Sequence, residues 1–108
     1  MIVAAFASCD KIDEIEGMND QRAEYGYRAV TYDFNYDEAA GPFDSAIREV
    51  GCWEPVMGGA DDKVIDICDR CYEQLKSSTL QGRNGKVLIM KIRHPDGKQK
   101  VIREYKFE

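Results

Sequence analysis

The stretch VLIMKIRHPDGKQKVIREYKF, residues 87–107, decides the fold of this chain. Its centre holds Pro95, Asp96 and Gly97, the residue types that a tight turn between two strands requires. Runs rich in β-branched and aromatic residues precede and follow this turn, which is typical of strands. The sequence therefore predicts two antiparallel strands, Val87–Arg93 and Lys100–Phe107, joined as a hairpin.

Two amphipathic segments upstream of the hairpin predict helices. The first begins near Pro42, a residue suited to a first helical turn, and ends near Gly51. The second begins at Asp61 and Asp62, because acidic residues favour a helix N-terminus. Apolar residues recur at one-face spacing in both segments: Phe43, Ile47 and Val50 in the first, and Val64, Cys68, Cys71 and Leu75 in the second.

The first third of the chain is expected to contribute two more strands. Residues 2–8 are apolar throughout, as in a strand that is covered on both faces. Residues 10–24 predict a short helix followed by a loop. Residues 27–36 alternate between apolar and polar side chains, which predicts a strand whose covered face carries Val30, Tyr32, Phe34 and Tyr36.

Together these segments predict one α+β domain over residues 1–108. It has an antiparallel sheet of about four strands and two main helices packed on one face, in the order β-(α)-β-α-α-β-β. A chain of 108 residues can bury one modest core. No apolar run reaches the roughly 18 residues of a membrane span, so we expect no membrane insertion and a cytoplasmic location.

Charge is divided unevenly along the chain. Residues 1–80 hold 17 acidic and 7 basic side chains, whereas residues 81–108 hold 3 acidic and 8 basic ones. The whole chain has a formal net charge of −5. This balance disfavours a protein coated in positive potential for nucleic acid, and it leaves one local basic segment at the C-terminal end.

The four cysteines raise the question of a metal site. Cys68 and Cys71 have the C-x-x-C spacing, and Cys9 and Cys52 could complete a set of four zinc ligands. However, Cys68 lies well inside the second helix, where no helix N-terminus stabilises a thiolate, so redox chemistry is not expected. Because the pair lies on an apolar helix face, we favour buried core cysteines, with zinc as the alternative.

No catalytic motif is visible in the sequence. The phosphate-binding, dinucleotide-binding, serine-hydrolase and zinc-protease patterns are all missing from the printed chain. Asp96 and Glu104 imitate part of a nuclease signature, but the turn holds Asp96 about 26 Å from Glu104 along the strand. We therefore expect a protein that is not an enzyme and that needs no cofactor.

The leading functional hypothesis is a non-enzymatic module that binds the surface of a larger intracellular protein as an inhibitor or regulator. Small inhibitors that viruses carry against host defences share this size and charge. In a sharper version, the acidic side chains imitate a nucleic-acid backbone. A homodimer is also compatible with the sequence. The expected partner-binding residues are Trp53, Met57, Tyr36, Asp33, Asp37, Glu38, Asp61 and Asp62.

The rival hypothesis is a nucleic-acid-binding module that uses the basic C-terminal hairpin. Alternation along the two strands predicts an outer face rich in lysine and arginine, which could hold a phosphate backbone. The alternative interpretation is an edge strand protected by lysine against unwanted pairing. The residues expected to bind nucleic acid are Lys91, Arg93, Lys98, Lys100 and Lys106.

Overall fold

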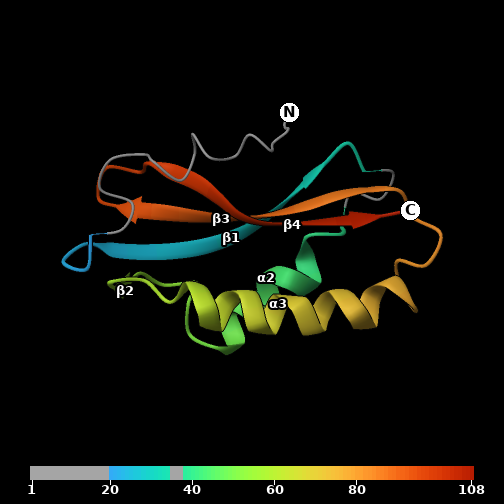
Figure 1. The fold of residues 1–108 in the computed structure, drawn as a ribbon, viewed down its shortest axis with the longest axis horizontal. Helices are drawn as coiled ribbons and strands as arrows, with labels where there is room; N and C mark the ends of the chain where they lie inside the picture. The colour runs from blue at the N-terminus through green and yellow to red at the C-terminus, as the bar shows by residue number, and fades with distance from the viewer. Residues whose placement is uncertain (1–19, 35–37) are drawn as a thin grey trace.

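The computed structural model describes residues 20–34 and 38–108, and Figure 1 shows their arrangement. The elements in chain order are β1 (Glu24–Tyr32), α2 (Gly41–Glu49), β2 (Val56–Met57), α3 (Asp61–Lys76), β3 (Gly85–His94) and β4 (Gln99–Phe107). Residues 2–8, most of the segment 10–24, Tyr36 and Asp37 lie outside the described part. The predictions for them therefore stay predictions.

The described strands form one antiparallel sheet in the order β2-β1-β3-β4. The predicted hairpin is confirmed, since β3 and β4 pair with each other and Gly97 has a φ of +76° in the turn between them. β1 pairs with β3 from Glu24↔His94 to Tyr32↔Lys86. The predicted α+β class is confirmed.

Both helices cover the same face of the sheet, as predicted (Figure 1). From α2, Phe43 and Ile47 are buried, and from α3, Val64, Cys68 and Leu75 are buried. They pack with the buried side chains of β3 and β4, namely Val87, Ile89, Tyr105 and Phe107. Burying aliphatic and aromatic side chains in this way is the main favourable term in folding.

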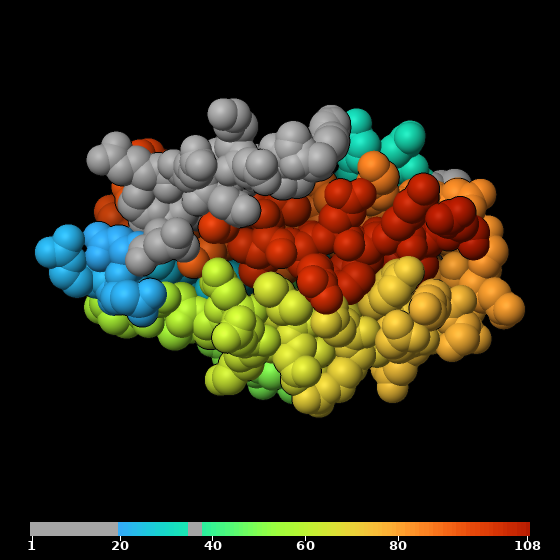
Figure 2. Space-filling model, in the orientation of Figure 1, coloured from blue at the N-terminus to red at the C-terminus, as the bar shows by residue number. Residues whose placement is uncertain are grey.

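The long helix α3 is fixed to the edge strand β4 by aromatic and polar contacts. In the space-filling view, β4 lies directly against α3 (Figure 2). The Tyr72 ring lies 5.0 Å from both the Tyr105 and the Phe107 ring, between ring centroids. The Tyr105 hydroxyl donates to Asp69 Oδ1 at 2.6 Å, and Arg103 pairs with the same carboxylate. These contacts hold the helical layer in register with the sheet.

The covered face of β1 differs from the prediction. The side chains that face the helices are Tyr25, Tyr27 and Ala29, whereas Val30 and Tyr32 point to the opposite side and are exposed. The prediction for Val30 and Tyr32 was wrong because aromatic residues occur on both faces of this strand, so alternation does not reveal which face is covered. Phe34 is half-buried against the core, and the change of direction occurs at Asp33, which has a φ of +54°.

A bulge in β4 also overturns the predicted outer face of the hairpin. Ile89 pairs with Arg103 and Met90 pairs with Val101, so Ile102 has no partner on β3. A one-residue bulge moves every preceding side chain to the other face. Lys100, which pairs with Lys91, is consequently turned to the helix-covered side, and both lysines are buried. Their predicted exposure was wrong.

The opposite face of the sheet is not covered by any helix of the described residues (Figure 1). We call it the helix-free face. Because side chains alternate along a strand, it carries Arg28, Val30 and Tyr32 from β1. Their β3 partners on the same face are Met90, Leu88 and Lys86. Within the described residues, no helix is long and apolar enough to span a bilayer.

Candidate functional site

The segment that follows α2 places Trp53 at the edge of β1. The Cys52 N–H donates to the Ile47 carbonyl at 3.0 Å, and the Cys52 carbonyl accepts from the Tyr27 N–H at 3.1 Å. Cys52 is buried in the core, and the indole of Trp53 lies against Arg28, which belongs to the helix-free face. Gly26 allows this close approach, since a Cβ there would lie 3.1 Å from the Trp53 carbonyl oxygen.

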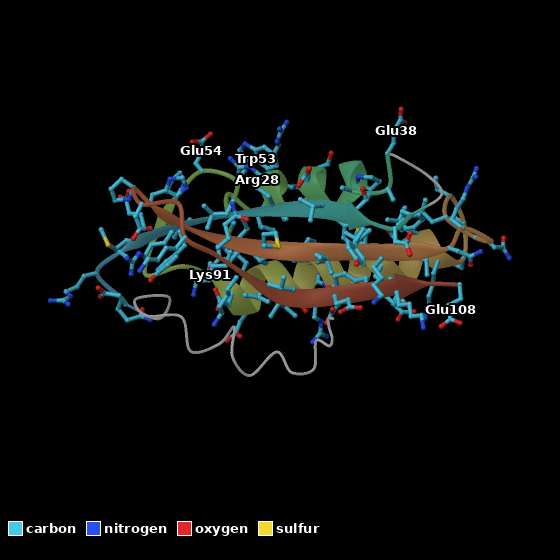
Figure 3. All side chains as sticks on the ribbon, turned by 90° about the horizontal axis from the view of Figure 1, so that it is seen from above. Arg28, Glu38, Trp53, Glu54, Lys91 and Glu108 are labelled. Carbon is cyan, nitrogen blue, oxygen red and sulfur yellow. The ribbon has the colours of Figure 1, made fainter. Side chains whose placement is uncertain are left out.

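Two arginines lie against the Trp53 ring. The guanidinium carbon of Arg28 is 3.7 Å from the ring centroid, and that of Arg48 is 3.9 Å from it. Arg28 Nη1 also donates to the carbonyl oxygens of Tyr27 and Trp53, at 3.1 and 2.9 Å. Figure 3 shows Arg28 and Trp53 together beside β1. Each cation–π contact is worth about 0.5–1 kcal/mol when it is exposed.

The charge around this ring is positive and only partly balanced. Among the described residues, no carboxylate lies within ion-pair distance of Arg28 or Arg48. The nearby acid is Asp44, whose Oδ1 accepts from the Ala29 N–H at 2.8 Å. Burial raises the pKa of Asp44, while Arg28 and Arg48 act in the opposite direction. Asp44 therefore caps the edge of β1 and offsets part of the two positive charges.

A hollow of about 360 Å³ lies beside the indole and is lined by Arg48, Gly51, Trp53 and Glu54. Gly51 has a φ of +80°, and no atom lies within 4 Å of the position that a Cβ would occupy. The hollow therefore opens over the turn that ends α2. Arg48 and Glu54 bring opposite charges to its two sides without forming an ion pair.

Exposed apolar side chains lie on the helix-free face, to which Arg28, the β1 contact of the indole, also belongs. Val30, Tyr32 and Met57 have 42%, 59% and 60% of their surface exposed, and they are the large exposed hydrophobic residues of the described chain. Met57 pairs with Glu24 at the sheet edge, which places its side chain on the helix-free face as well. Arginine, tryptophan and apolar residues thus share one surface.

The predicted acidic residues do not join this surface as a group. Asp33 and Glu38 are exposed, but Asp33 follows the end of β1 whereas Met57 pairs with its first residue. Along nine residues of strand, these ends are about 30 Å apart. Asp62 is exposed at the start of α3. The structure therefore places Met57 at one end of β1 and Asp33 at the other, with Trp53 beside Arg28 between them.

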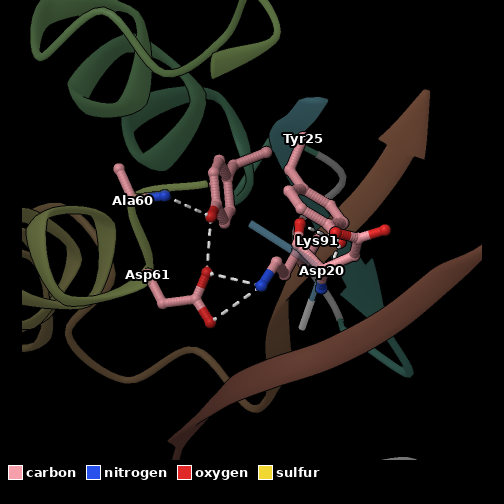
Figure 4. Close-up of polar contacts among 6 residues, drawn as sticks. Asp20, Tyr25, Ala60, Asp61 and Lys91 are labelled. Carbon is pink, nitrogen blue, oxygen red and sulfur yellow. Dashed lines mark hydrogen bonds and ion pairs between the residues drawn. The ribbon is translucent and has the colours of Figure 1, made fainter. Parts of the chain in front are cut away.

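Asp61 is turned inward and belongs to a polar network (Figure 4). The Tyr27 hydroxyl donates to Asp61 Oδ1 at 2.5 Å and accepts from the Ala60 N–H at 2.7 Å. Lys91 Nζ lies 3.1 Å from Asp61 Oδ1 and 3.2 Å from Oδ2. Burial and the hydrogen bond to Asp61 raise the pKa of Tyr27. This network joins α3 to β1 and β3, so Asp61 has a structural role, and its side chain stays partly exposed.

The residues expected to bind nucleic acid are also dispersed. Lys91 and Lys100 are buried, and Arg93 pairs with Asp96 within the hairpin turn. Lys98 is exposed at the turn, while Lys106 lies near the other end of β4, 3.7 Å from Glu108. The five side chains do not form one basic surface.

The described cysteines are core residues, as favoured from the sequence. Cys52 and Cys68 are buried, and Cys71 is half-buried beside them in the helical layer. Burial raises the pKa of all three thiols, that of Cys68 to about 12. The described part of the chain has no cluster of three or more residues that could hold a metal ion. Cys9 lies outside it.

Sequence reasoning identified Trp53 and Met57 but missed Arg28 and Arg48. Arg28 was interpreted only as part of a strand, and its contact with Trp53 depends on the path of the chain after α2. Arg48 offered a weak signal, since it lies in the last helical turn, close before Trp53.

Comparison with family models, curated proteins and solved structures finds no match to the chain.

Proposed function

We propose that this protein is a small non-enzymatic binding module that docks on a larger protein and acts as an inhibitor or regulator by occupying its surface. The docking surface, which we call the Trp53 patch, consists of Arg28, Val30, Tyr32, Arg48 and Trp53. The observation that carries the proposal is the half-buried indole of Trp53, held at the sheet edge by two arginines.

The composition of the Trp53 patch supports docking on a protein. Tryptophan, tyrosine and arginine dominate the binding energy of protein interfaces, usually in a few central positions. Contacts from Arg28 and Arg48 restrict the indole before any partner arrives. A restricted side chain loses less conformational entropy on binding, so less of the interaction free energy is lost to ordering.

The helix-free face supports the same conclusion. Its exposed Val30 and Tyr32 supply apolar area that the core does not use, since the core lies on the other side of the sheet. Apolar surface of this kind, bordered by charged residues, marks interaction sites more often than plain solvated surface does. Lys86 borders Tyr32 on this face, with Nζ 5.9 Å from the ring centroid.

The arrangement of charges favours this patch over the two surfaces expected from the sequence. An acidic docking face is less suitable because Asp61 is engaged by Lys91 and Tyr27. A nucleic-acid surface on the hairpin is less suitable because Lys91 and Lys100 are buried. Free Cys52, Cys68 and Cys71 suit a reducing compartment, so we expect the partner in the cytoplasm.

The test is to identify a retained protein by affinity capture and then to measure its binding to the full chain with both components purified. Trp53→Ala should weaken binding at least about thirtyfold, as is typical of a central tryptophan. Arg48→Gln, which removes an exposed side chain, should weaken it without affecting folding. Glu73→Gln on the exposed side of α3 is the control and should bind like the wild type.

The proposal would be wrong if the control variant lost affinity and Trp53→Ala did not. A partner that binds Trp53→Ala as tightly as the wild type, but loses affinity for Glu73→Gln, docks on the helical layer. The Trp53 patch could alternatively bind a second copy of the chain. Sedimentation of the purified protein that shows self-association abolished by Trp53→Ala would assign the patch to a homodimer instead.

A further inference from the structure

We propose that the Trp53 patch recognises a carboxylate, and that the bound segment of the partner places an aspartate or glutamate side chain in the hollow beside Trp53. This inference rests on the proposed function and names the chemistry of its ligand. The carboxylate would accept hydrogen bonds from the edge of the Arg48 guanidinium group while its methylene carbons contact the part of the indole that lines the hollow.

The donors needed for this contact are unused. An arginine carries five N–H donors in the plane of its guanidinium group, and a cation–π contact engages only the face of that group. Both hydrogen bonds of Arg28 come from Nη1, and Arg48 makes no hydrogen bond to the described residues. The planar donor edge of Arg48 is therefore available in the hollow, and such an edge matches a carboxylate. Arg28 does not line the hollow and adds its positive charge at the same ring.

Four other arginines of the described residues form ion pairs, unlike Arg28 and Arg48. In the described chain, four arginines each pair with an aspartate: Arg22 with Asp20, Arg70 with Asp66, Arg93 with Asp96 and Arg103 with Asp69. Arg28 and Arg48 have no such ion pair, although both guanidinium groups lie within 4 Å of one ring centroid. The two positive charges lie at the same ring and Asp44 offsets only part of them, so the local charge favours an incoming carboxylate.

The dimensions of the hollow suit a side chain. Its volume of about 360 Å³ lies at the lower end of the range for ligand pockets. Trp53 supplies an apolar wall, Arg48 supplies donors, and Gly51 leaves the floor open. A hollow with one aromatic wall and one planar donor fits a short chain of methylene groups that ends in a carboxylate.

Glu54 provides a second test, because removing its charge should change the affinity for a carboxylate in the opposite direction to removing the charge of Arg48. Its side chain is exposed and lines the same hollow, so it repels a bound carboxylate across a short distance. Removing the charge of Glu54 should therefore strengthen binding, whereas removing the charge of Arg48 should weaken it. A general loss of folding would weaken binding in both variants and would not produce this pair of results.

The experiment uses the fluorescence of the full chain, because Trp53 is its one tryptophan and every spectral change reports on this site. The protein is titrated at low salt with a short glutamate-rich peptide, with the same peptide carrying glutamine at each glutamate position, and with inorganic phosphate. The net charge of −5 repels acidic peptides in general, so a saturable response must come from a local positive site.

We expect saturable binding of the glutamate peptide, absent for the glutamine peptide and weaker for phosphate. Arg48→Gln should weaken it about tenfold, the effect of losing one hydrogen bond to a charged group. Glu54→Gln should strengthen it roughly two- to threefold, as for one exposed charge. Arg70→Gln, on the helical layer, should leave it unchanged. Equal binding of the glutamine peptide, tighter binding of phosphate, or an unaffected Arg48→Gln would overturn the proposal.

This result is separable from that of the proposed function. If a purified partner binds the wild type and not Trp53→Ala, while the glutamate peptide gives no response, the patch docks a protein but does not recognise a carboxylate. The partner could instead bind Trp53→Ala as tightly as the wild type, while peptide binding is weakened by Arg48→Gln and strengthened by Glu54→Gln. In that case the carboxylate site exists but the docking surface lies elsewhere.

Discussion

The guanidinium group of Arg48, at the end of α2, lies 3.9 Å from the centroid of the Trp53 ring. The contact spans the turn at Gly51 and restricts the indole at the sheet edge. The same indole is contacted by Arg28 from β1. Helix, turn and strand therefore meet at one aromatic side chain.

Loss of this contact should free the indole without unfolding the protein. Arg48→Gln is expected to cost about 0.5–1 kcal/mol of stability, since the contact is exposed. Acrylamide quenching of Trp53 fluorescence should become more efficient, and the emission should shift to the red. Arg70→Gln is the matched control and should change neither quantity. Unchanged quenching in Arg48→Gln would show that Arg28 alone holds the ring.

The buried ion pair between Lys91 and Asp61 should be important for stability. Lys91→Met leaves the Asp61 carboxylate without its cation beside Tyr27. Removing one partner of a buried pair typically costs 3–5 kcal/mol, and we expect about 2 kcal/mol here because Asp61 keeps contact with solvent. Urea unfolding measures the loss.

A double variant checks the origin of that loss. Lys91→Met combined with Asp61→Asn removes both charges and should recover part of the stability lost in the single variant. Lys98→Met, at the exposed hairpin turn, should have almost no effect. If the double variant is less stable than the sum of the two single losses, the charge explanation is wrong.

The two faces of the sheet should respond differently to truncation. Ile89→Ala removes a fully buried side chain and should cost about 2–5 kcal/mol. Val30→Ala on the helix-free face should cost less than about 1 kcal/mol, because Val30 is largely in solvent already. Thermal unfolding of the two variants provides the comparison. Equal losses would contradict the assignment of the covered face.

Stability should fall at alkaline pH because of Cys68. Burial raises the pKa of this thiol to about 12, so the folded state holds the proton more tightly than the unfolded state, whose thiol titrates near 8.5. This contribution is complete below about pH 8.5 and is lost as the pH rises from there toward 12. The free energy of unfolding should decrease over that interval.

Replacement of the thiol separates its effect from those of other groups. Cys68→Ala should show a smaller decrease between pH 8.5 and 11 than the wild type, because the raised pKa of Cys68 is removed. Tyr27, whose raised pKa does not depend on Cys68, titrates alike in both proteins. The contribution of Cys68 to the raised pKa of Tyr105 disappears with the thiol and acts in the same direction. Parallel pH profiles would exclude Cys68 as a source of the decrease.

Local sequence patterns predicted the helices and the hairpin. They did not predict which face of β1 is covered or which way Lys100 points. The Pro95–Gly97 turn and the one-face spacing in both helices depend on neighbouring residues, so the sequence revealed them. The covered face of β1 was missed because Tyr25, Tyr27 and Tyr32 place aromatic rings on both sides of one strand. The exposure of Lys100 was missed because the bulge at Ile102 leaves no mark in the pattern of alternation.

Only part of the candidate site could be predicted from the sequence, because the rest depends on contacts between distant segments. An isolated tryptophan in an irregular segment, Trp53, indicated an interface without any knowledge of the fold. The contributions of Arg28 and Arg48 require the three-dimensional path that brings a strand and a helix end to the same ring. The ion pair of Asp61 with the buried Lys91 was missed because the two residues are far apart in the sequence.

The alternation along β1 has a consequence for how such a protein could diversify. Tyr25, Tyr27 and Ala29 hold the interior, while Arg28, Val30 and Tyr32, interleaved with them, face away from it. Replacement of Val30 and Tyr32 would change the chemistry of the helix-free face and leave the buried core unchanged. A lineage under pressure from a changing target could therefore revise every other residue of a single strand and keep the scaffold that presents them.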